Sequence, residues 1–587
     1  MRRGGIVIAL LAGSVGCATT GVGDGPAAPS QFPSRAALDK IAATPAPVKL
    51  AADPGVEADG WQLTGPLPDT IEPMQYSDGS PFQAILEEVA ARRPGLVAMP
   101  ASMHCVAQET GLFLLKKHAL PAERLARFIA GRCGAVAADV QVTYSDAPAP
   151  ERLSPERASE ELRKLVLESL QRALKGGPQQ AGIWFGQRDG RAAVVISVAT
   201  RRANLDSLSI VPAGDGRVVV RGELLEAADH LEGVYNRGHF GFGRCVSDPS
   251  VALPRFQVTC AVDPTDASAW IEVAAFSAGR VLGHVVANLI VFPNGTPAAA
   301  YHDAGYVTRS VAAGADAREQ LLALLNEVRR GAGLPEVALA ARESEVATRV
   351  GPHYFAAVAG IESELNADAV VLGLRAGWEI EGDVLSGEFT AGALSNSDDL
   401  GRLLDYVLER PSGREALLGH ATRLVALGPV LAPEQHIIAL VASSYALFGG
   451  ANHEADAKRV VGRLTKARID QQMSAPLPLA AIDGYAQEAA GRVQRGELQP
   501  KRALERILQR SAERLPGVPF HGWVFEASSL DDVRFPRELI WYPIAGVTVS
   551  VTHYRPRNSP WSRLVVFIVV ASTHGSGTSV SRPSHAM

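Results

Sequence analysis

The sequence predicts an α+β protein built from repeated units, and two observations carry this prediction. First, three stretches of the 587-residue chain each combine helical periodicity with two β-rich runs joined by a polar loop, which is typical of a β-hairpin. Second, one pattern recurs, because Leu325 and Arg329 return as Leu464 and Arg468, 139 residues later in both cases. Helices followed by paired antiparallel strands predict α+β sandwich units, and a chain of this length needs several domains.

The chain begins with features of an export signal. MRRGG is short and basic, and IVIALLA is apolar but too short to span a bilayer. The next residues, Ser14-Val15-Gly16-Cys17, resemble a bacterial lipobox, in which the cysteine is lipidated and becomes the mature N-terminus. We expect residues 1–17 to be a lipoprotein signal peptide and Cys17 to carry lipid. The protein would then be exported and anchored in a cell-envelope membrane; the alternative is plain secretion with cleavage near Cys17.

Two segments of biased composition are expected to lack regular structure. Residues 18–75 are rich in Ala, Pro and Gly, which is typical of a flexible tether. Residues 573–587 read THGSGTSVSRPSHAM and predict a disordered tail.

The first predicted unit covers residues 80–205. It contains a faint copy of the repeat in ILEEVAARRPGL and a hairpin signature in AGIWFGQRDGRAAVVISVAT. It also contains Cys105 and Cys133. Exported chains can form disulfides, and local pairing is the simplest of the three pairings that four cysteines allow.

A segment without helical periodicity follows, over residues 206–312. GRVVVRGELL, RFQVTCAV, AWIEVAAF and VLGHVVANLIVF predict successive strands between turns, so we expect an inserted small β-sandwich. Cys245 and Cys260 lie 15 residues apart in this segment. A disulfide between them would contribute about 3 kcal/mol in the chain-entropy model.

The last two units cover residues 316–450 and 454–572. LLNEVRRGAGL opens the first of them and VGRLTKARIDQQM belongs to the start of the second. Each unit ends in a hairpin signature, ATRLVALGPVLAPEQHIIALVASSY and IAGVTVSVTHYRPRNSPWSRLVVFIVVA respectively.

Residues 324–447 resemble the CAP superfamily, the SCP or cysteine-rich secretory protein-like domains. The resemblance lies in LLNEVRRGAGLPEVALAARESEVA, which matches the opening of bacterial CAP domains, and in LLDYVLERPSGREALLGHATRLVALGPV, which matches a later pattern. The units at 80–205 and 454–572 share this resemblance only through the internal repeat, so we interpret them as degenerate CAP-like units. The resemblance implies that each repeated unit is an α-β-α sandwich.

The resemblance also implies a candidate site. Well-preserved CAP domains have a cleft with two histidines and two acidic residues; some bind a divalent metal there, and others bind lipids or partner proteins. His353 occupies the first histidine position and Glu379 falls near an acidic position, with Glu381 as the competing choice, whereas Gly413 stands where the second histidine is expected. Because a metal site needs several converging ligands, we predict no cofactor and no catalytic residue. We interpret His353 as a half-buried histidine at a helix end.

Other signatures of chemistry are weak. HEADA at His453 lacks the second histidine of the HExxH motif and predicts a solvated helix start. The net charge of −5 argues against a nucleic-acid partner. We therefore expect a non-catalytic envelope lipoprotein that binds a protein or lipid partner. The alternatives are a divalent-metal-dependent hydrolase that uses His353 and Glu379, or a lipid-binding protein of the CAP superfamily.

Overall fold

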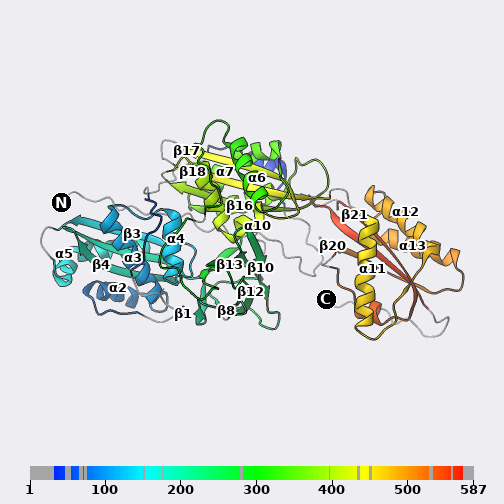
Figure 1. The fold of residues 1–587 in the computed structure, drawn as a ribbon, viewed down its shortest axis with the longest axis horizontal. Coiled ribbons are helices and arrows are strands. Elements are labelled where there is room, and N and C mark those ends of the chain that lie inside the picture. The colour runs from blue at the N-terminus through cyan, green and yellow to red at the C-terminus, as the bar shows by residue number, and fades with distance from the viewer. Residues whose placement is uncertain are drawn as a thin grey trace. The chain divides into compact units, whose positions relative to one another are not determined.

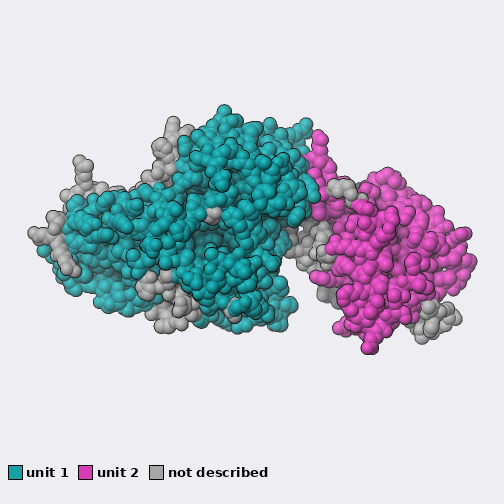
Figure 2. Space-filling view, in the orientation of Figure 1, with its two compact units in different colours: residues 1–21, 33–379, 387–445 teal, residues 22–32, 380–386, 446–587 magenta. Residues whose placement is uncertain are grey.

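The structure is a computed structural model that divides into two compact units. Unit 1 includes Pro33–Glu379 and Gly387–Tyr445, and unit 2 includes Ile380–Ser386 and Ala446–Met587 (Figure 2). The described residues are 32–45, 55–64, 70–71, 76–149, 153–174, 176–212, 214–277, 280, 282–303, 305–395, 397–432, 437–448, 452–527, 530, 533–556 and 559–572. The predicted signal peptide with Cys17 and the predicted tail at 573–587 lie outside them.

Helices and small sheets alternate along both units, which confirms the α+β class (Figure 1). The first sheet of unit 1 has helices on both faces. Along β5, Val194 and Ile196 pack with α2 and α5, whereas Ala193 and Val195 pack with α3 and α4. The elements are α2 (Pro81–Ala91), β2 (Val97–Ala98), α3 (Ala101–Lys117), α4 (Glu123–Arg132), β3 (Gln141–Pro148), α5 (Pro155–Ala173), β4 (Gln179–Arg188) and β5 (Arg191–Thr200).

The second helix-covered sheet of unit 1 is built in the same way. Along β18, Ile438 and Leu440 pack with α6 and α9, whereas Ala439 and Val441 pack with α7 and α8. Its elements are α6 (Ala317–Gly331), β15 (Ala338–Leu339), α7 (Ala341–Val358), α8 (Glu364–Ala376), β16 (Val384–Ser395), α9 (Leu400–Glu409), α10 (Pro411–Leu417), β17 (Thr422–Ala432) and β18 (Ile437–Leu447).

Unit 2 contains a third sheet of this kind. Along β22, Val566 and Ile568 pack with α11, whereas Val565 and Phe567 pack with α12 and α13. Its elements are α11 (His453–Ile469), β19 (Leu477–Pro478), η2 (Ala480–Ile482), α12 (Asp483–Gln494), α13 (Pro500–Arg514), β20 (Phe520–Ala527), α14 (Arg537–Trp541), β21 (Ile544–Tyr554) and β22 (Arg563–Ser572).

The three sheets share one strand order. They run β2-β4-β5-β3, β15-β17-β18-β16 and β19-β21-β22-β20. In each, a two-residue strand lies parallel to the first strand of the hairpin, and the edge strand on the other side comes from between the helices. Strands buried on both faces need continuous apolar runs, which explains sequences such as RLVVFIVVAS.

The repeated arginine has the same role in two of these sandwiches. Arg329 and Arg468 are buried, and each donates from Nη1 to a carbonyl oxygen near the end of the helix that precedes the hairpin: Leu417 O and Ile540 O, at 2.6 Å in both cases. The guanidinium therefore satisfies carbonyl groups that a helix end leaves without partners. The arginine therefore recurs after 139 residues because it makes the same contact in both sandwiches.

Two four-stranded sheets lie between the first and second sandwiches in sequence and share one core. One has the order β10-β9-β13-β14 and the other β11-β12-β8-β6. The strands are β6 (Ala203–Leu205), β8 (Arg217–Leu224), β9 (His230–Arg237), β10 (Gly241–Arg244), β11 (Val246–Ser247), β12 (Arg255–Ala261), β13 (Ala269–Phe276) and β14 (His284–Val291). All eight residues of β13 are buried, because its second face is covered by α4 and α10.

Both cysteine pairs form disulfides with the local pairing that the sequence favours. Cys105 in α3 is joined to Cys133 at the end of α4, with 5.6 Å between their Cα atoms. Cys245, where the chain passes from β10 in one sheet to β11 in the other, is joined to Cys260 of β12, with a Cα separation of 4.3 Å.

Part of the predicted tether at 18–75 is folded. α1 (Arg35–Ala42) packs on unit 1 through Leu38, which is buried against α7 and α8. Trp61 is buried too, and its ring lies 4.7 Å from that of Phe113. A two-residue strand, β1 (Thr70–Ile71), pairs with β7 (Leu208–Ser209). The prediction of little regular structure is wrong for these residues, because the buried side chains of Leu38 and Trp61 and the strand pairing of β1 secure a segment of otherwise loop-like composition.

Candidate functional site

His353 lies inside α7, and its imidazole is engaged with a neighbouring carboxylate. It is 2 % exposed, and its Nδ1 is 2.9 Å from Oε1 of Glu362, in the turn before α8. The other carboxylate oxygen of Glu362 accepts from Asn366 at 3.0 Å. The expectation of a half-buried histidine is therefore corrected: His353 is buried, because α7 packs across β17 with no space between.

Glu379 has different partners from His353. Its backbone N–H donates to Oε1 of Glu343 at 2.6 Å, and its carboxylate is 3.7 Å from Arg342 on the surface. The neighbouring candidate Glu381 is exposed.

Gly413 cannot accommodate any side chain. A Cβ atom there would lie 1.8 Å from the carbonyl oxygen of Val407, far inside van der Waals contact. The position therefore fits no histidine. Within the described ranges, no group of three or more His, Cys, Asp or Glu side chains is placed to hold a metal ion.

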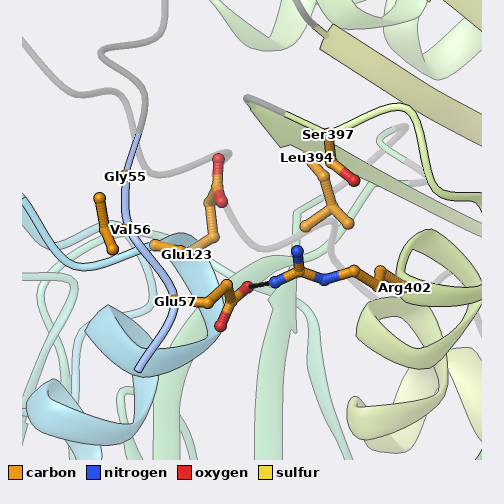
Figure 3. Close-up of a pocket in the computed structure, with 8 residues that line it drawn as sticks. Gly55, Val56, Glu57, Glu123, Leu394, Ser397 and Arg402 are labelled. Atoms are coloured by element: carbon orange, nitrogen blue, oxygen red, sulfur yellow. Dashed lines mark ion pairs between the residues drawn. The ribbon is translucent and has the colours of Figure 1, made fainter. Parts of the chain in front are cut away.

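A polar pocket lies elsewhere in unit 1, between the start of α4 and the start of α9 (Figure 3). Its volume is about 160 Å³, and it is lined by Gly55, Val56, Glu57, Ala122, Glu123, Leu394, Ser397 and Arg402. Glu57 and Arg402 face each other across it with Oε1 and Nη2 2.7 Å apart. The pocket thus combines two carboxylates, one guanidinium and a hydroxyl.

The wall that carries Glu57 is held by backbone contacts. The N–H of Val56 donates to Leu120 O at 2.8 Å, and the N–H of Ala122 donates back to Val56 O at 3.0 Å. Gly55 makes this approach possible, since a Cβ there would lie 2.5 Å from the Cα of Ala122. Burial raises the pKa of Glu57 above its ordinary value, and the Arg402 and Arg124 guanidinium groups oppose the increase.

Arg124 of α4 is buried beside this pocket among three carboxylates. It contacts Asp303 directly, and its Nη1 and Nε are each 3.4 Å from Asp405 and Glu409 of α9, respectively. One guanidinium cannot neutralise three carboxylates. Burial raises the pKa of Asp405 to about 7, and the adjacent Asp303 carboxylate also raises it. Asp405 therefore keeps its proton to a higher pH than an ordinary carboxyl group.

Glu272 of β13 extends this network into the β-sandwich. Its Oε1 is 3.2 Å from Arg127 of α4 and 3.8 Å from Arg410, which lies between α9 and α10. Arg127 also lies over the ring of Trp270, 3.9 Å from its centre. These charges come from the first helix-covered sandwich, the β-sandwich and the second helix-covered sandwich. They pair with each other only when the three parts are in contact, so the network stabilises the packing of these parts inside unit 1.

A second, partly buried ion pair joins the β-sandwich to α10 in unit 1. Arg244 of β10 donates from Nε to Oε1 of Glu415 in α10 at 2.6 Å. Burial raises the pKa of Glu415 to about 7, and the neighbouring Glu388 carboxylate raises it further.

The sequence did not point to the pocket or to the network. Arg124 and Arg127 are three residues apart on a helix, as are many solvated charges, and only the fold brings Asp303 and Asp405 to them. Comparison of the chain with models of known protein families and with curated proteins found no match. In the described part of the chain, no helix has the length and apolar composition of a membrane span.

Proposed function

We propose that this chain is an exported, lipid-anchored protein of the cell envelope, built from three CAP-like units, that binds a partner and does not catalyse a reaction. The shared strand order of the three sheets, each with helices on both faces, supports the CAP-like assignment. The altered site positions support loss of the metal-dependent chemistry, because His353 is engaged by Glu362 and Gly413 has no space for a ligand.

The polar pocket is the binding site in this proposal, and its charge and volume indicate which kind of partner it binds. Its lining includes two carboxylates, from Glu57 and Glu123, and one guanidinium, from Arg402. An acyl chain would strip water from these groups without replacing their hydrogen bonds, which is costly. A volume of about 160 Å³ equals that of about five water molecules, enough for one extended side chain. The pocket therefore suits a single cationic side chain, such as a lysine of a partner protein, better than a lipid.

Saturation-transfer NMR with two matched probes tests this proposal. Nα-acetyl-lysine amide carries an ammonium group, and Nα-acetyl-norleucine amide has a similar apolar chain without charge. Saturation should pass from the protein to the lysine chain several-fold more efficiently than to the norleucine chain, because only the ammonium pairs with the carboxylates.

The variant Glu57→Gln should remove this difference, since Gln keeps the shape but not the charge. Glu336→Gln is the matched control, because Glu336 is an exposed carboxylate of unit 1 that forms a surface ion pair with Arg330 at 3.1 Å. Equal transfer to both probes in the unchanged protein, or an unchanged preference in Glu57→Gln, would contradict a cationic partner at this pocket.

A further inference from the structure

Two histidines of unit 2 meet nitrogen to nitrogen. His553 lies in β21, and His453 is the first residue of α11. Nδ1 of His553 is 3.1 Å from Nε2 of His453. The expectation that His453 is a solvated helix start is therefore corrected, since its side chain is 23 % exposed and packs on a second imidazole.

The outer nitrogens of both rings face carboxylates. Nε2 of His553 is 3.1 Å from Asp383 Oδ2, and the other oxygen of Asp383 accepts from Ser562 Oγ at 2.9 Å. Nδ1 of His453 is 3.9 Å from Asp456 Oδ2, beyond hydrogen-bond distance. Phe448 stacks on the His553 ring, with 4.7 Å between ring centres and 7° between planes. A carboxylate behind the imidazole and a packed ring face are the usual supports of a metal-ligating histidine.

The spacing of the inner nitrogens suits two ligands of one ion. Nitrogens bound about 2.0–2.1 Å from an ion, at about 90° to 109° to each other, lie about 2.8–3.4 Å apart, and the observed separation is 3.1 Å. Imidazole pairs favour Cu²⁺, Ni²⁺ and Zn²⁺, and Cu²⁺ binds most tightly in the general order of divalent metals.

We propose that His453 and His553 form a binding site for one borderline divalent transition-metal ion, with Cu²⁺ the tightest. Among the described residues no third His, Cys, Asp or Glu joins them, so water would complete the coordination and the ion would exchange readily.

Binding needs no net loss of a proton from two neutral rings. In the tautomer in which His553 Nε2 donates to Asp383, the hydrogen between the rings is that of His453 Nε2. That hydrogen moves to His453 Nδ1, which has no hydrogen-bond partner among the described residues and faces Asp456. Both inner nitrogens are then free to donate their lone pairs to the ion. The positive end of the α11 dipole opposes a cation at this place, and the acidic side chains of its first turn, Glu454 and Asp456, offset that effect.

Titration of the purified, tag-free protein with Cu²⁺ at about pH 7.5 tests the site. Calorimetry gives the stoichiometry, and electron paramagnetic resonance identifies the ligands. The unchanged protein should bind one equivalent that His453→Gln and His553→Gln both lose. The control His521→Gln alters another histidine of unit 2 and should keep it. Asp383→Asn should weaken binding by about 10–100-fold without abolishing it.

The spectrum should show nitrogen ligands that disappear in His453→Gln. Circular dichroism checks that each variant is folded, and Asp383→Asn remains informative if His553→Gln is not. Binding that persists in both histidine variants, or no binding by the unchanged protein, would overturn the proposal.

Discussion

Replacing Asp405 with asparagine should make the stability of unit 1 less dependent on pH. The folded protein raises the pKa of Asp405 to about 7 from its ordinary 3.8, so the folded state holds a proton that the unfolded chain releases. For a raised pKa, the stabilising contribution is complete below pH 3.8 and is lost as the pH rises through about 7. Asparagine cannot titrate, and its Oδ1 can still accept from the N–H of Val307, which lies 2.8 Å from the present carboxylate.

The size of the effect follows from the difference between the two pKa values. About three pKa units, at about 1.36 kcal/mol each, correspond to about 4 kcal/mol at about pH 8. Part of this stabilising contribution is already lost at about pH 5. The free energy of unfolding should therefore fall by about 2–3 kcal/mol between about pH 5 and about pH 8 through Asp405 alone. The Asp405 side chain is only 5 % exposed, so solvent screens little of it.

Urea unfolding at about pH 5 and about pH 8 measures this difference in the free energy of unfolding. Pulse-labelling hydrogen exchange of peptides from α9 and β13 restricts the measurement to unit 1. The unchanged protein should lose about 2–3 kcal/mol more than Asp405→Asn between the two pH values. The contribution of Glu415 is common to both proteins and cancels. Asp189→Asn, in an exposed turn between β4 and β5, is the control and should behave like the unchanged protein. An identical pH dependence in Asp405→Asn would refute the raised pKa of Asp405.

Three further changes have defined outcomes. Cys17→Ala should leave a precursor of higher mass and move the protein from the membrane to the soluble fraction, as mass spectrometry and fractionation would show; unaltered membrane association would count against the lipid anchor. Gly413→Ala forces a Cβ against a backbone carbonyl and should cost about 3 kcal/mol or more in urea unfolding, whereas Gly462→Ala, with open space in α11, should be neutral or stabilising. His353→Ala removes a buried ring and its bond to Glu362 and should cost about 2–4 kcal/mol with no change in metal content; loss of bound metal would contradict the vestigial site.

Local sequence patterns were enough to predict the hairpins and the disulfide pairing, because both depend on residues that are close together in the chain. The paired β-rich runs that became β4–β5, β17–β18 and β21–β22 indicated the hairpins, and the closeness of Cys245 to Cys260 in sequence indicated their pairing. Leu38 shows what such patterns miss. It sits in an eight-residue helix of mixed composition and is buried only because α7 and α8 offer it a surface.

The candidate site was less predictable because its chemistry depends on partners far away in sequence. Arg124 and Asp405 are 281 residues apart, and each lies on a helix face where charges ordinarily meet water. The burial of His353 was missed for the same reason, since neither β17 nor Glu362 can be placed against it from helical periodicity alone. The position where the resemblance expects the second histidine has no room for a side chain. The sequence shows only that Gly413 stands there, and the close approach of the Val407 carbonyl is visible only in the structure.

Photo-crosslinking in intact cells tests most directly whether the polar pocket binds a partner. A photoreactive residue in place of Ser397, at the pocket wall, should give one discrete protein adduct, and the additional change Glu57→Gln should reduce its yield. The same photoreactive residue in place of Glu336, on the exposed surface of unit 1, should not give that adduct. Absence of any adduct from the pocket position, or the same adduct from both positions, would contradict a binding role for this pocket.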